Sequence, residues 1–311
     1  MIVALTPNPA LDRLVIVPGF RTATVTRVAE VRETAGGKGL NVVRAARALG
    51  AAVRAVGPLG GATGRYVADL AAREGLDAQW AWVAAGETRT CTLVADLATH
   101  DTLALNERGP DFSPEDWRRF TALAHAQTSP TLVTCSGSLP PQVTPTMFTA
   151  FLAALAACGT PIMLDTSGAA LAGTLGLPLA LIKANQHEIA EALHVAVTSL
   201  DDAARVARRL IVGGPAQIMI TLGAAGALLA TNSGEVWHAR PPDVEIVSDV
   251  GSGDAALAAF AVAALRGDAA PVALRHAVAC GTANALLPGP AMFSLDTYAQ
   301  CVNDVVVERL S

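Results

Sequence analysis

The sequence predicts an α/β protein in which a central, mostly parallel sheet lies between helices on both faces, with a small β-sheet lid. Two observations carry this prediction. Short apolar runs of strand length alternate with helical patterns over most of the 311 residues, which is typical of parallel sheets covered by helices. Two β-rich segments, at about 11–33 and 79–106, interrupt the alternation. No linker flanks either segment, so we expect residues 1–311 to form one domain with the lid segments inserted in it.

Turn-forming residues delimit the elements. Most apolar runs end in Gly, Pro, Asn or Asp, and they predict strands at 2–5, 131–135, 161–165, 181–184 and 217–222. Helical patterns predict helices at 40–49, 64–74, 114–126, 145–157 and 201–211. Ser113 and Thr144, each followed by Pro, are expected N-caps, and Gly50 and Gly159 lie where helices commonly end. In the two lid segments the strand-like stretches are 25–31 and 88–94.

Composition excludes several classes of function. Apolar residues make up 52% of the chain and charged residues 16%, against about 25% in a typical protein, which excludes intrinsic disorder. The net charge is −5 and no basic stripe is present, so we expect no nucleic-acid partner. The uncharged stretch 210–234 is broken by glycines and a proline. We expect a loop and two buried strands there, and no membrane partner.

The N-terminus and the cysteines indicate a cytoplasmic protein. Residues 1–5 lack the basic start of a secretory signal. The cysteines are odd in number and none forms a C-x-x-C pair, so neither a zinc site nor a disulfide framework is expected. We expect buried thiols in a reducing compartment. The five cysteines are Cys91, Cys135, Cys158, Cys280 and Cys301.

The segment 249–254, Asp-Val-Gly-Ser-Gly-Asp, is the strongest candidate for a chemical site. It leads into an alanine-rich helix, so its last N–H groups are expected to form an anion site, and Gly251 and Gly253 let a ligand approach the backbone. Asp254 would repel a bound phosphate unless a hydroxyl lies between them. The alternative is that Asp254 only complements the helix dipole. The segment fits the loose dinucleotide pattern weakly, and no Walker A loop is present.

Three further segments carry candidate polar residues. Residues 35–41 place glycines around Lys38 and open a helix at Asn41, so they are either a ligand-binding turn or a flexible turn with a helix cap. Residues 135–141 follow a buried strand and are either part of a site or an ordinary Ser-rich turn. Asn185 and Glu188 fit a capping arrangement. The alternative is that Glu188 holds Mg²⁺ through water near bound phosphates.

Together these motifs resemble the PfkB branch of the ribokinase-like sugar kinases. The resemblance runs almost end to end, in family order, through residues 6–12, 35–41, 88–89, 136–141, 165–168, 183–188, 221–226 and 250–254. Within the branch, the chain is similar to the ketohexose-phosphate kinases, namely 1-phosphofructokinase, tagatose-6-phosphate kinase and the minor 6-phosphofructokinase. The resemblance implies a ribokinase-like fold and a lid that often pairs between subunits, so a homodimer through the lid is expected.

The resemblance also implies a role for each candidate residue. Asp254 is implied as the catalytic base, beside an anion hole of Gly251, Ser252 and Gly253. The residues implied to bind the sugar and its phosphate are Asp12, Arg27, Gly37, Lys38, Asn41, Arg89 and Ser138. The residues implied to line the ATP and Mg²⁺ region are Lys183, Asn185, Glu188, Thr221, Gly223 and Gly226, with Glu188 reaching Mg²⁺ through water. The chain departs from the usual family residues at Ala184, Ala255 and Ala259.

The implied reaction is the ATP-dependent phosphorylation of a ketohexose monophosphate to the bisphosphate, with tagatose 6-phosphate, fructose 1-phosphate or fructose 6-phosphate as substrate. Two cations near one small substrate, Arg89 and Lys38, suit a phosphorylated sugar. The positive helix end is expected to lower the pKa of Asp254. Two alternatives stay open: a neutral-sugar or nucleoside kinase of the same family, and a catalytically silent regulator that binds sugar phosphate or nucleotide.

Overall fold

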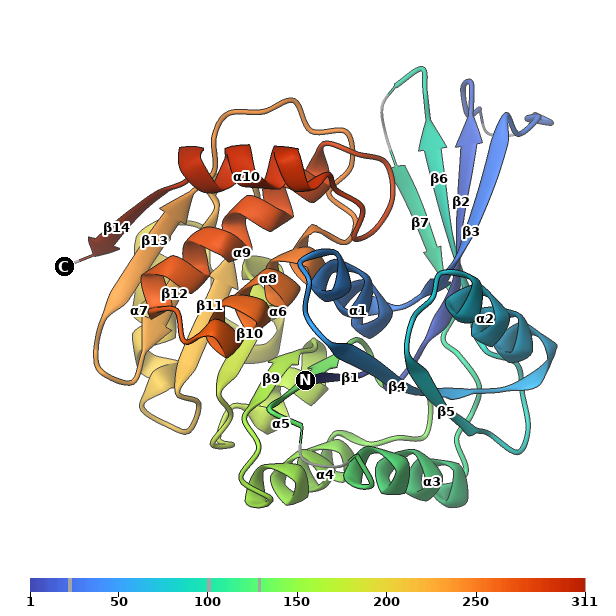
Figure 1. Cartoon of the computed structure of the whole chain (residues 1–311), viewed down its shortest axis with the longest axis horizontal. Helices are drawn as coiled ribbons and strands as arrows, with labels where there is room; N and C mark the ends of the chain where they lie inside the picture. Colours follow the sequence, from blue (N-terminus) through green and yellow to red (C-terminus); the bar gives the residue numbers. More distant parts are fainter. Residues whose placement is uncertain (22–23, 100–101, 128–129, 311) are drawn as a thin grey trace.

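A computed structural model of the chain describes residues 1–21, 24–99, 102–127 and 130–310. These residues form a large sheet of ten strands and a separate small sheet of four strands. Figure 1 shows the small sheet projecting from one end of the molecule, beyond helix α1 (Lys38–Ala48). The predicted α/β class, with its additional small sheet, is therefore confirmed.

The large sheet is mostly parallel, as predicted. In sheet order its strands are β14 (Val306–Leu310), β13 (Val236–Arg240), β12 (Ala227–Thr231), β11 (Gln217–Thr221), β10 (Leu181–Asn185), β9 (Ile162–Asp165), β8 (Leu132–Ser136), β1 (Ile2–Leu5), β4 (Val53–Leu59) and β5 (Ala78–Trp82). Neighbours from β11 to β5 run parallel, whereas β12, β13 and β14 extend the sheet antiparallel. The uncharged stretch 210–234 thus supplies β11 and β12.

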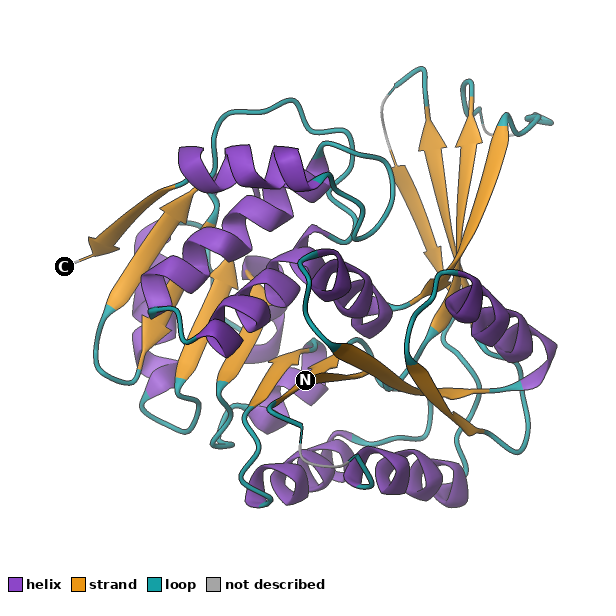
Figure 2. Cartoon of the chain, viewed as in Figure 1, coloured by secondary structure: helices purple, strands orange, loops and turns teal. Residues whose placement is uncertain are grey.

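Helices cover both faces of this sheet (Figure 2). One face carries α1, α2 (Gly61–Arg73), α8 (Ser252–Arg266), α9 (Ala270–Ala285) and α10 (Leu295–Asp304). The other carries α3 (Pro114–His125), α4 (Pro145–Ala157), α5 (Gly168–Thr174), α6 (Gln186–Leu193) and α7 (Leu200–Ile211). Successive strand residues point to opposite faces, so Ile2 and Ala4 join the first apolar core while Val3 and Leu5 join the second.

Capping residues fix where the predicted helices begin and end. The side chain of Ser113 accepts a hydrogen bond from the Asp116 N–H, and that of Thr144 accepts one from the Met147 N–H. Gly50 and Gly159 follow α1 and α4 with φ values of 82° and 80°, the left-handed conformation in which glycine ends a helix without strain. These cap assignments are confirmed.

The predicted start of the helix at 40–49 is wrong. Gly37, with φ of 100°, takes the N-cap position, and α1 begins at Lys38. Asn41 therefore lies inside the helix, buried, and does not cap it. The interpretation of Asn41 as a helix cap is excluded by this placement.

The small sheet draws on both predicted lid segments. Its order is β3 (Glu30–Gly36), β2 (Ala10–Val17), β6 (Arg89–Asp96) and β7 (Thr102–Asn106), with β2 and β6 parallel at its centre. Residues 22–23 and 100–101 of these segments lie outside the described residues. Two predictions are wrong in detail. Residues 79–82 belong to β5, which pairs with β4 in the large sheet. Of 25–31 only the last two residues lie in a strand, and Val25 is 96% exposed.

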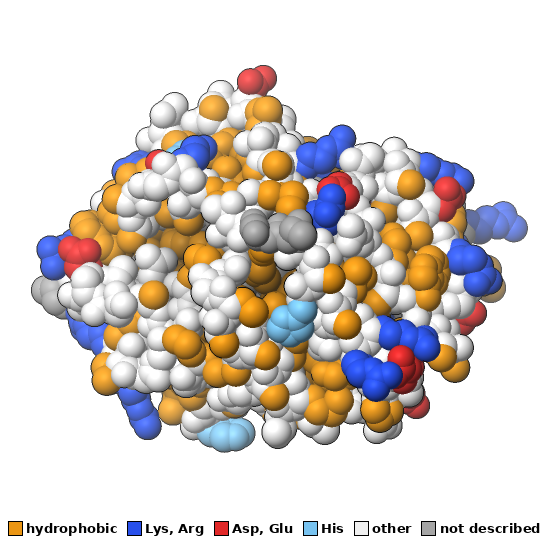
Figure 3. Space-filling view, turned by 60° about the horizontal axis from the view of Figure 1, so that its bottom comes forward, with side chains coloured by type: hydrophobic (Ala, Val, Ile, Leu, Met, Phe, Trp, Pro, Cys, Tyr) orange, Lys and Arg blue, Asp and Glu red, His pale blue; other side chains and the backbone are white. Residues whose placement is uncertain are grey.

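Charge is sparse on the surface. Figure 3 shows one face on which basic and acidic side chains occur in small mixed groups among apolar and uncharged atoms. No helix in the described ranges is long and apolar enough to cross a membrane. The expectation of buried thiols is correct for Cys135, Cys280 and Cys301. It is wrong for Cys158, which is exposed just after α4 ends, and Cys91 is only partly buried.

Candidate active site

A cavity of about 620 Å³ opens between the small sheet and the loops that follow strands β8 and β9. Nine of the predicted site residues line it: Asp12, Gly37, Lys38, Asn41, Arg89, Ser138, Glu188, Gly251 and Asp254. The sequence therefore identified residues that the fold brings together from distant segments. Arg27 is exposed and is not among the lining residues. The remaining predicted residues are Ser252, Gly253, Lys183, Asn185, Thr221, Gly223 and Gly226, and they are not among the lining residues.

Asp254 lies in the first turn of α8 and is only 5% exposed. The N-cap is Gly251, whose φ of 80° suits glycine; a Cβ there would stand 2.6 Å from the Cα of Pro290. The first N–H groups of a helix have no partner within it, so this end is suited to an anion. Burial, followed by the nearby carboxylate of Asp165, raises the pKa of Asp254 to about 7. The expectation that the helix end lowers this pKa is wrong, because desolvation outweighs the helix dipole.

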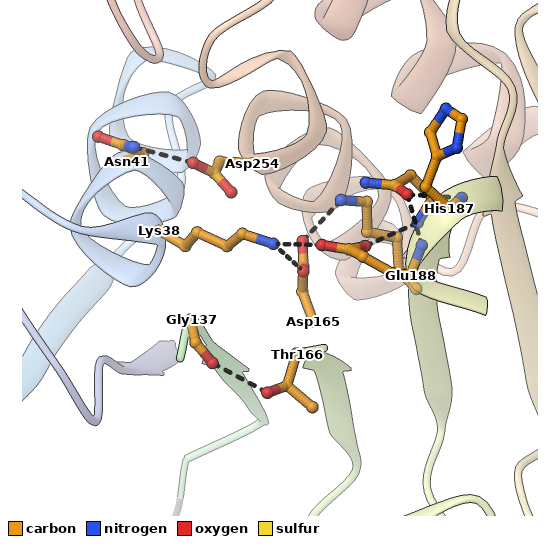
Figure 4. A network of polar contacts seen from close by, with 10 residues as sticks. Lys38, Asn41, Gly137, Asp165, Thr166, His187, Glu188 and Asp254 are labelled. Atoms are coloured by element: carbon orange, nitrogen blue, oxygen red, sulfur yellow. Dashed lines mark hydrogen bonds and ion pairs between the residues drawn. The ribbon is translucent and has the colours of Figure 1, made fainter. Parts of the chain in front are cut away.

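Asn41 holds the Asp254 carboxylate. Its Nδ2 donates to Asp254 Oδ2 at 2.8 Å, across a separation of 213 residues (Figure 4). The other amide atom, Oδ1, accepts from Arg44 at 3.0 Å. The two helices that carry this pair, α1 and α8, pack against each other. One Asp254 oxygen is thus fixed, which leaves the other for a ligand in the cavity.

Two lysines converge on Asp165, the last residue of β9 (Figure 4). Lys38 Nζ lies 2.7 Å from Asp165 Oδ1 and Lys183 Nζ lies 2.6 Å from Asp165 Oδ2. Asp165 is fully buried, which by itself would raise its pKa, but the two ammonium groups hold the pKa of this carboxyl below its ordinary value. Burial likewise opposes the charge of Lys38, yet the carboxylates of Asp165, Glu188 and Asp254 together raise the pKa of Lys38.

Sequence reasoning quoted Asp165 within a family motif but assigned it no role. The available signal was its position, because a carboxylate at the end of a buried parallel strand lies at the edge where such sheets bind ligands. Its partners could not be read from the sequence, since Lys38 is 127 residues away.

Glu188 has one carboxylate oxygen in a helix cap and the other at the cavity wall. Asn185 and Glu188 form a capping box at the start of α6, in which Glu188 Oε2 accepts from the Asn185 N–H at 2.8 Å. The other carboxylate oxygen, Oε1, lies 3.2 Å from Lys38 Nζ at the cavity wall. The capping prediction is confirmed, and one oxygen still faces a cation.

Asp12 lies at the opposite side of the cavity, on β2. Its Oδ2 accepts from the Gly37 N–H at 3.3 Å. Burial raises the pKa of Asp12 to about 6, against the lowering effects of that hydrogen bond and of Arg44. A Cβ at Gly36 would stand 2.1 Å from Asp12 Cγ, so the carboxylate occupies the space of the missing side chain.

Arg89, on β6, reaches the cavity with unused hydrogen-bonding capacity. Two of its guanidinium nitrogens donate to the backbone oxygens of Asn8 and Glu107, at 2.9 and 3.3 Å. The buried Nε has no hydrogen-bond partner in the described part of the chain. A buried donor without a partner is costly, so this atom is suited to an anionic ligand.

Asn8 was missed by sequence reasoning, although it lies in the quoted motif 6–12. Its buried Nδ2 donates to the Arg108 carbonyl, Ser138 Oγ and the Leu139 carbonyl, at 3.1, 3.2 and 3.4 Å. Asn8 thereby ties together two loops of the cavity wall. Arg108, which also lines the cavity, was likewise not predicted.

Thr221, Gly223 and Gly226 lie outside this cavity lining. Thr221 ends β11 beside Asn185 of β10, so the segment 221–226 starts next to the capping box. Gly226 has φ of 88°, and a Cβ there would stand 1.9 Å from the Ala239 carbonyl oxygen, so only glycine fits.

Comparisons with known proteins agree with this geometry. The family model described as "pfkB family carbohydrate kinase" matches residues 8–297. The chain is 30% identical to 1-phosphofructokinase of Bacillus subtilis over 310 residues, covering 100% of both chains. It is 37% identical to 1-phosphofructokinase of Haloferax volcanii over 280 residues, covering 89% of this chain and 88% of the relative.

Solved structures show the same fold. Phosphofructokinase-2 of Escherichia coli superposes with a TM-score of 0.91 at 28% identity, over 97% of this chain and 98% of that one. Ribokinase of Arabidopsis thaliana, with a TM-score of 0.74 and 18% identity, covers 97% of this chain and 98% of its own, and shows the fold alone. On the match to the family model and the full-length relatives, the chain belongs to the pfkB family of carbohydrate kinases.

Proposed function

We propose that this kinase transfers the γ-phosphoryl group of ATP to a hydroxyl of a ketohexose monophosphate, giving ADP and the bisphosphate. The observation that carries the proposal is the pairing within one cavity of Asp254, at the start of α8, with Arg89, whose buried Nε lacks a partner among the described residues. Asp254 can accept the proton of the hydroxyl that is phosphorylated, and Arg89 can bind the phosphate that the substrate already carries. Relatives named 1-phosphofructokinase, and a structure of phosphofructokinase-2 with fructose-6-phosphate, support this substrate class.

In the proposed mechanism, Asp254 accepts the hydroxyl proton on the oxygen that Asn41 does not hold. The transition state of phosphoryl transfer is loose and needs little early proton removal, so a carboxylate suffices. Its raised pKa makes Asp254 a stronger base than an ordinary aspartate. Gly251 and Gly253 would direct N–H groups at the transferring phosphoryl group. The Ser252 N–H, predicted to join them, instead donates to the Asp249 carbonyl at 3.1 Å.

The carboxylates near Lys38 fit Mg²⁺ in their chemistry. Asp165 Oδ1 and Glu188 Oε1 both converge on one ammonium nitrogen, and hard carboxylate oxygens are the ligands that Mg²⁺ prefers. Glu188 would hold the ion through water. When bound with ATP, Mg²⁺ neutralises phosphate charge.

The nucleotide is proposed to extend along the adjoining edge of the large sheet. Asn185 ends β10, two residues after Lys183, and Thr221 ends the neighbouring strand β11. Gly223 provides backbone that a ligand can approach closely, because no atom lies within 4 Å of a Cβ there. Gly226 instead makes room for the Ala239 carbonyl and shapes the turn. ATP would therefore lie beside the sugar cavity, with its phosphates near Lys183.

We further propose one kinase domain that acts in the cytoplasm, with the small sheet as a lid that pairs two copies. Val31, Leu103 and Leu105 of this sheet are 40%, 46% and 53% exposed, which is unusual for strand residues of this type. One relative, phosphofructokinase-2 of Escherichia coli, has been described in a tetrameric inhibited form. Light scattering of the protein and of a Leu105→Asp variant tests the pairing: we expect a dimer that becomes a monomer, and an unchanged mass would contradict the interface.

A coupled assay of ADP release tests the function. The substrates are fructose 1-phosphate, fructose 6-phosphate, tagatose 6-phosphate, free fructose, ribose and adenosine, each with MgATP. We expect kcat/KM to be highest for one of the phosphorylated ketohexoses. A preference for an unphosphorylated acceptor would favour the neutral-sugar or nucleoside kinase. Binding of a sugar phosphate without ADP release would favour the silent regulator.

A further inference from the structure

We propose that Arg44 is a positioning residue for the reaction: it fixes the amide of Asn41, through which it holds Asp254, and it ties this pair to the small sheet. The inference rests on the proposed function, because it takes Asp254 as the base. Arg44 appeared in no motif that sequence reasoning singled out.

The first step is the orientation of the Asn41 amide. Arg44 NH1 donates to Asn41 Oδ1 at 3.0 Å, and Asn41 Nδ2 donates to Asp254 Oδ2 at 2.8 Å. A guanidinium can only donate hydrogen bonds, so it can face only the oxygen end of the amide. Arg44 therefore presents the N–H end of Asn41 to the carboxylate. A flipped amide would direct Oδ1 at Asp254 and repel it.

The second step is what holds Arg44 itself. Its Nε donates to Glu74 Oε2 at 2.9 Å and its NH2 donates to the Ala35 carbonyl at 2.9 Å. Glu74 Oε1 in turn accepts from the Ala35 N–H at 3.2 Å. Arg44, Glu74 and Ala35 thus form a closed ring. The side chains of Arg44 and Glu74 are 16% and 25% exposed, so the ring is largely shielded from water.

The ring connects the small sheet to helices α1 and α2. Ala35 belongs to β3 of the small sheet and leads directly into Gly36 and Gly37. Arg44 belongs to α1, and Glu74 is the C-cap residue of α2. A displacement of β3 therefore pulls on Arg44, and the pull reaches Asp254 through Asn41. The position of the small sheet and the orientation of the base are coupled through one side chain.

The charged groups that face Asp254 come from other elements. They are Lys38 from α1, Asp165 from β9 and Lys183 from β10. Arg44 donates hydrogen bonds to Asn41, Glu74 and Ala35, and its charge also lowers the pKa of Asp12. Its effect on Asp254 passes through the Asn41 amide. This gives the inference a specific signature, because the effect of Arg44 must vanish when the amide is absent.

A double-mutant cycle on kcat tests this signature with the full-length enzyme. We expect Arg44→Met to lower kcat about 10- to 100-fold, the range that the loss of an orienting partner costs at other sites. KM for ATP stays the same. In an Asn41→Ala background, Arg44→Met causes no further loss of kcat. Two independent, additive losses would overturn the proposal.

The pH profile gives a second readout that a merely structural residue would not move. The hydrogen bond from Asn41 favours the ionised form of Asp254. Arg44→Met should therefore displace the acid limb of kcat/KM to higher pH, and raising the pH should recover part of the lost rate. The displacement should be larger than in the Asn41→Ala background, where only the pKa of Asp12 still responds to Arg44. An unmoved acid limb would contradict the proposal.

Arg47→Met is the matched control. Arg47 lies three residues after Arg44 in α1, about one helical turn. It donates to the backbone carbonyl of Glu74 and not to the Glu74 carboxylate or to Asn41. We expect wild-type kcat and an unmoved pH profile. If Arg44→Met does not accumulate as folded protein, Arg44→Lys enters the same cycle. It keeps the charge, but its single nitrogen cannot reach partners that three separate guanidinium nitrogens contact. Its smaller loss must also vanish without Asn41.

Failure of this inference is distinguishable from failure of the proposed function. If the wild-type enzyme phosphorylates no sugar phosphate, or if Asp254→Asn keeps its kcat, the proposed function fails and this inference falls with it. If the wild type is active and Asp254→Asn is not, while Arg44→Met behaves like Arg47→Met, only the role of Arg44 is wrong.

Discussion

Gly253 and Lys183 are so close that no side chain fits between them. A Cβ added to Gly253 would stand 2.5 Å from Lys183 Nζ. Lys183 cannot retreat easily, because it is 3% exposed and lies 2.6 Å from Asp165. Gly251 has a positive φ but Gly253 does not, so the requirement for glycine at 253 comes from this contact and not from backbone strain.

We therefore expect Gly253→Ala to lower kcat about 10²- to 10³-fold, as the loss of one anion-hole donor does elsewhere. The displaced ammonium and the intruding methyl group both lie where the transferring phosphoryl group is proposed to pass. Steady-state kinetics and an ATP titration measure kcat and affinity separately. Gly176→Ala is the control, because no atom lies within 4 Å of a Cβ there. A variant with unchanged kcat and weakened ATP binding would contradict the anion-hole role.

Asp254→Asn should lower kcat about 10²- to 10⁴-fold, the usual contribution of a general base. The amide keeps an oxygen for Asn41 and nearly the same volume, so the fold and ATP binding should persist. Isothermal titration with ATP and the coupled assay check the two halves of this expectation. If the variant keeps most of its kcat, Asp254 is not the base and only complements the dipole of α8.

The raised pKa of Asp254 predicts opposite pH dependences for activity and stability. The base must be ionised, so kcat/KM falls as the pH drops below about 7. The native protein keeps a proton on Asp254 that the unfolded chain, with a pKa near 3.8, has already released, so this group adds stability as the pH falls from about 7 toward 4. Asp254→Asn should therefore be more stable than wild type at about pH 8, by a margin that shrinks at about pH 5. Urea unfolding at both pH values measures this, and an equal margin would refute the assignment.

Arg89→Ala should raise KM for the sugar phosphate about 10- to 150-fold, the cost of losing a charge-assisted hydrogen bond of about 1.5–3 kcal/mol. Arg89→Lys should raise it less, because it keeps the charge and loses the planar fork. KM for ATP should change little. Arg13→Ala is the control in the same sheet, since Arg13 pairs with Glu33 and does not line the cavity. A rise in both KM values would indicate that Arg89 stabilises the small sheet instead.

Asp165→Asn should destabilise the fold by about 3–5 kcal/mol, because it leaves the buried ammonium of Lys183 without its anion. Denaturant unfolding measures the change. Asp69→Asn, which breaks the exposed pair with Arg73, should cost no more than about 1 kcal/mol. Equal losses in the two variants would mean that the Asp165 cluster is solvated in solution.

Elements with local signals could be predicted from the sequence. The helix at 145–157 coincides with α4, because a cap, a proline and a glycine bracket it. Helix α9 was not predicted, since it is buried along most of its length and has no polar stripe to give a period. Strand β14 was also missed, because its pairing partner β13 lies about 70 residues earlier in the chain.

Some residues of the candidate site could be predicted from the sequence and others could not. Residues in glycine-rich motifs could be identified, because a backbone that a ligand approaches closely requires glycine. Asp165, Asn8 and Arg44 could not, because their roles arise from partners far along the chain or from a ring of contacts that only the fold closes. Arg27 was assigned by resemblance in a strand-like stretch, and its position depends on a segment whose strand begins only at Glu30.

The 213 residues between Asn41 and Asp254 also set an order of events during synthesis. At about 5–20 residues per second, a ribosome would deliver α8 about 10 to 40 seconds after α1. Until α8 is made, the apolar residues of α1 that pack against it are exposed. A chain of this length would contain the proposed sugar-binding residues but not the proposed base, Asp254. Enzymatic activity should therefore be among the last properties to appear during synthesis, because the proposed base arrives only with α8.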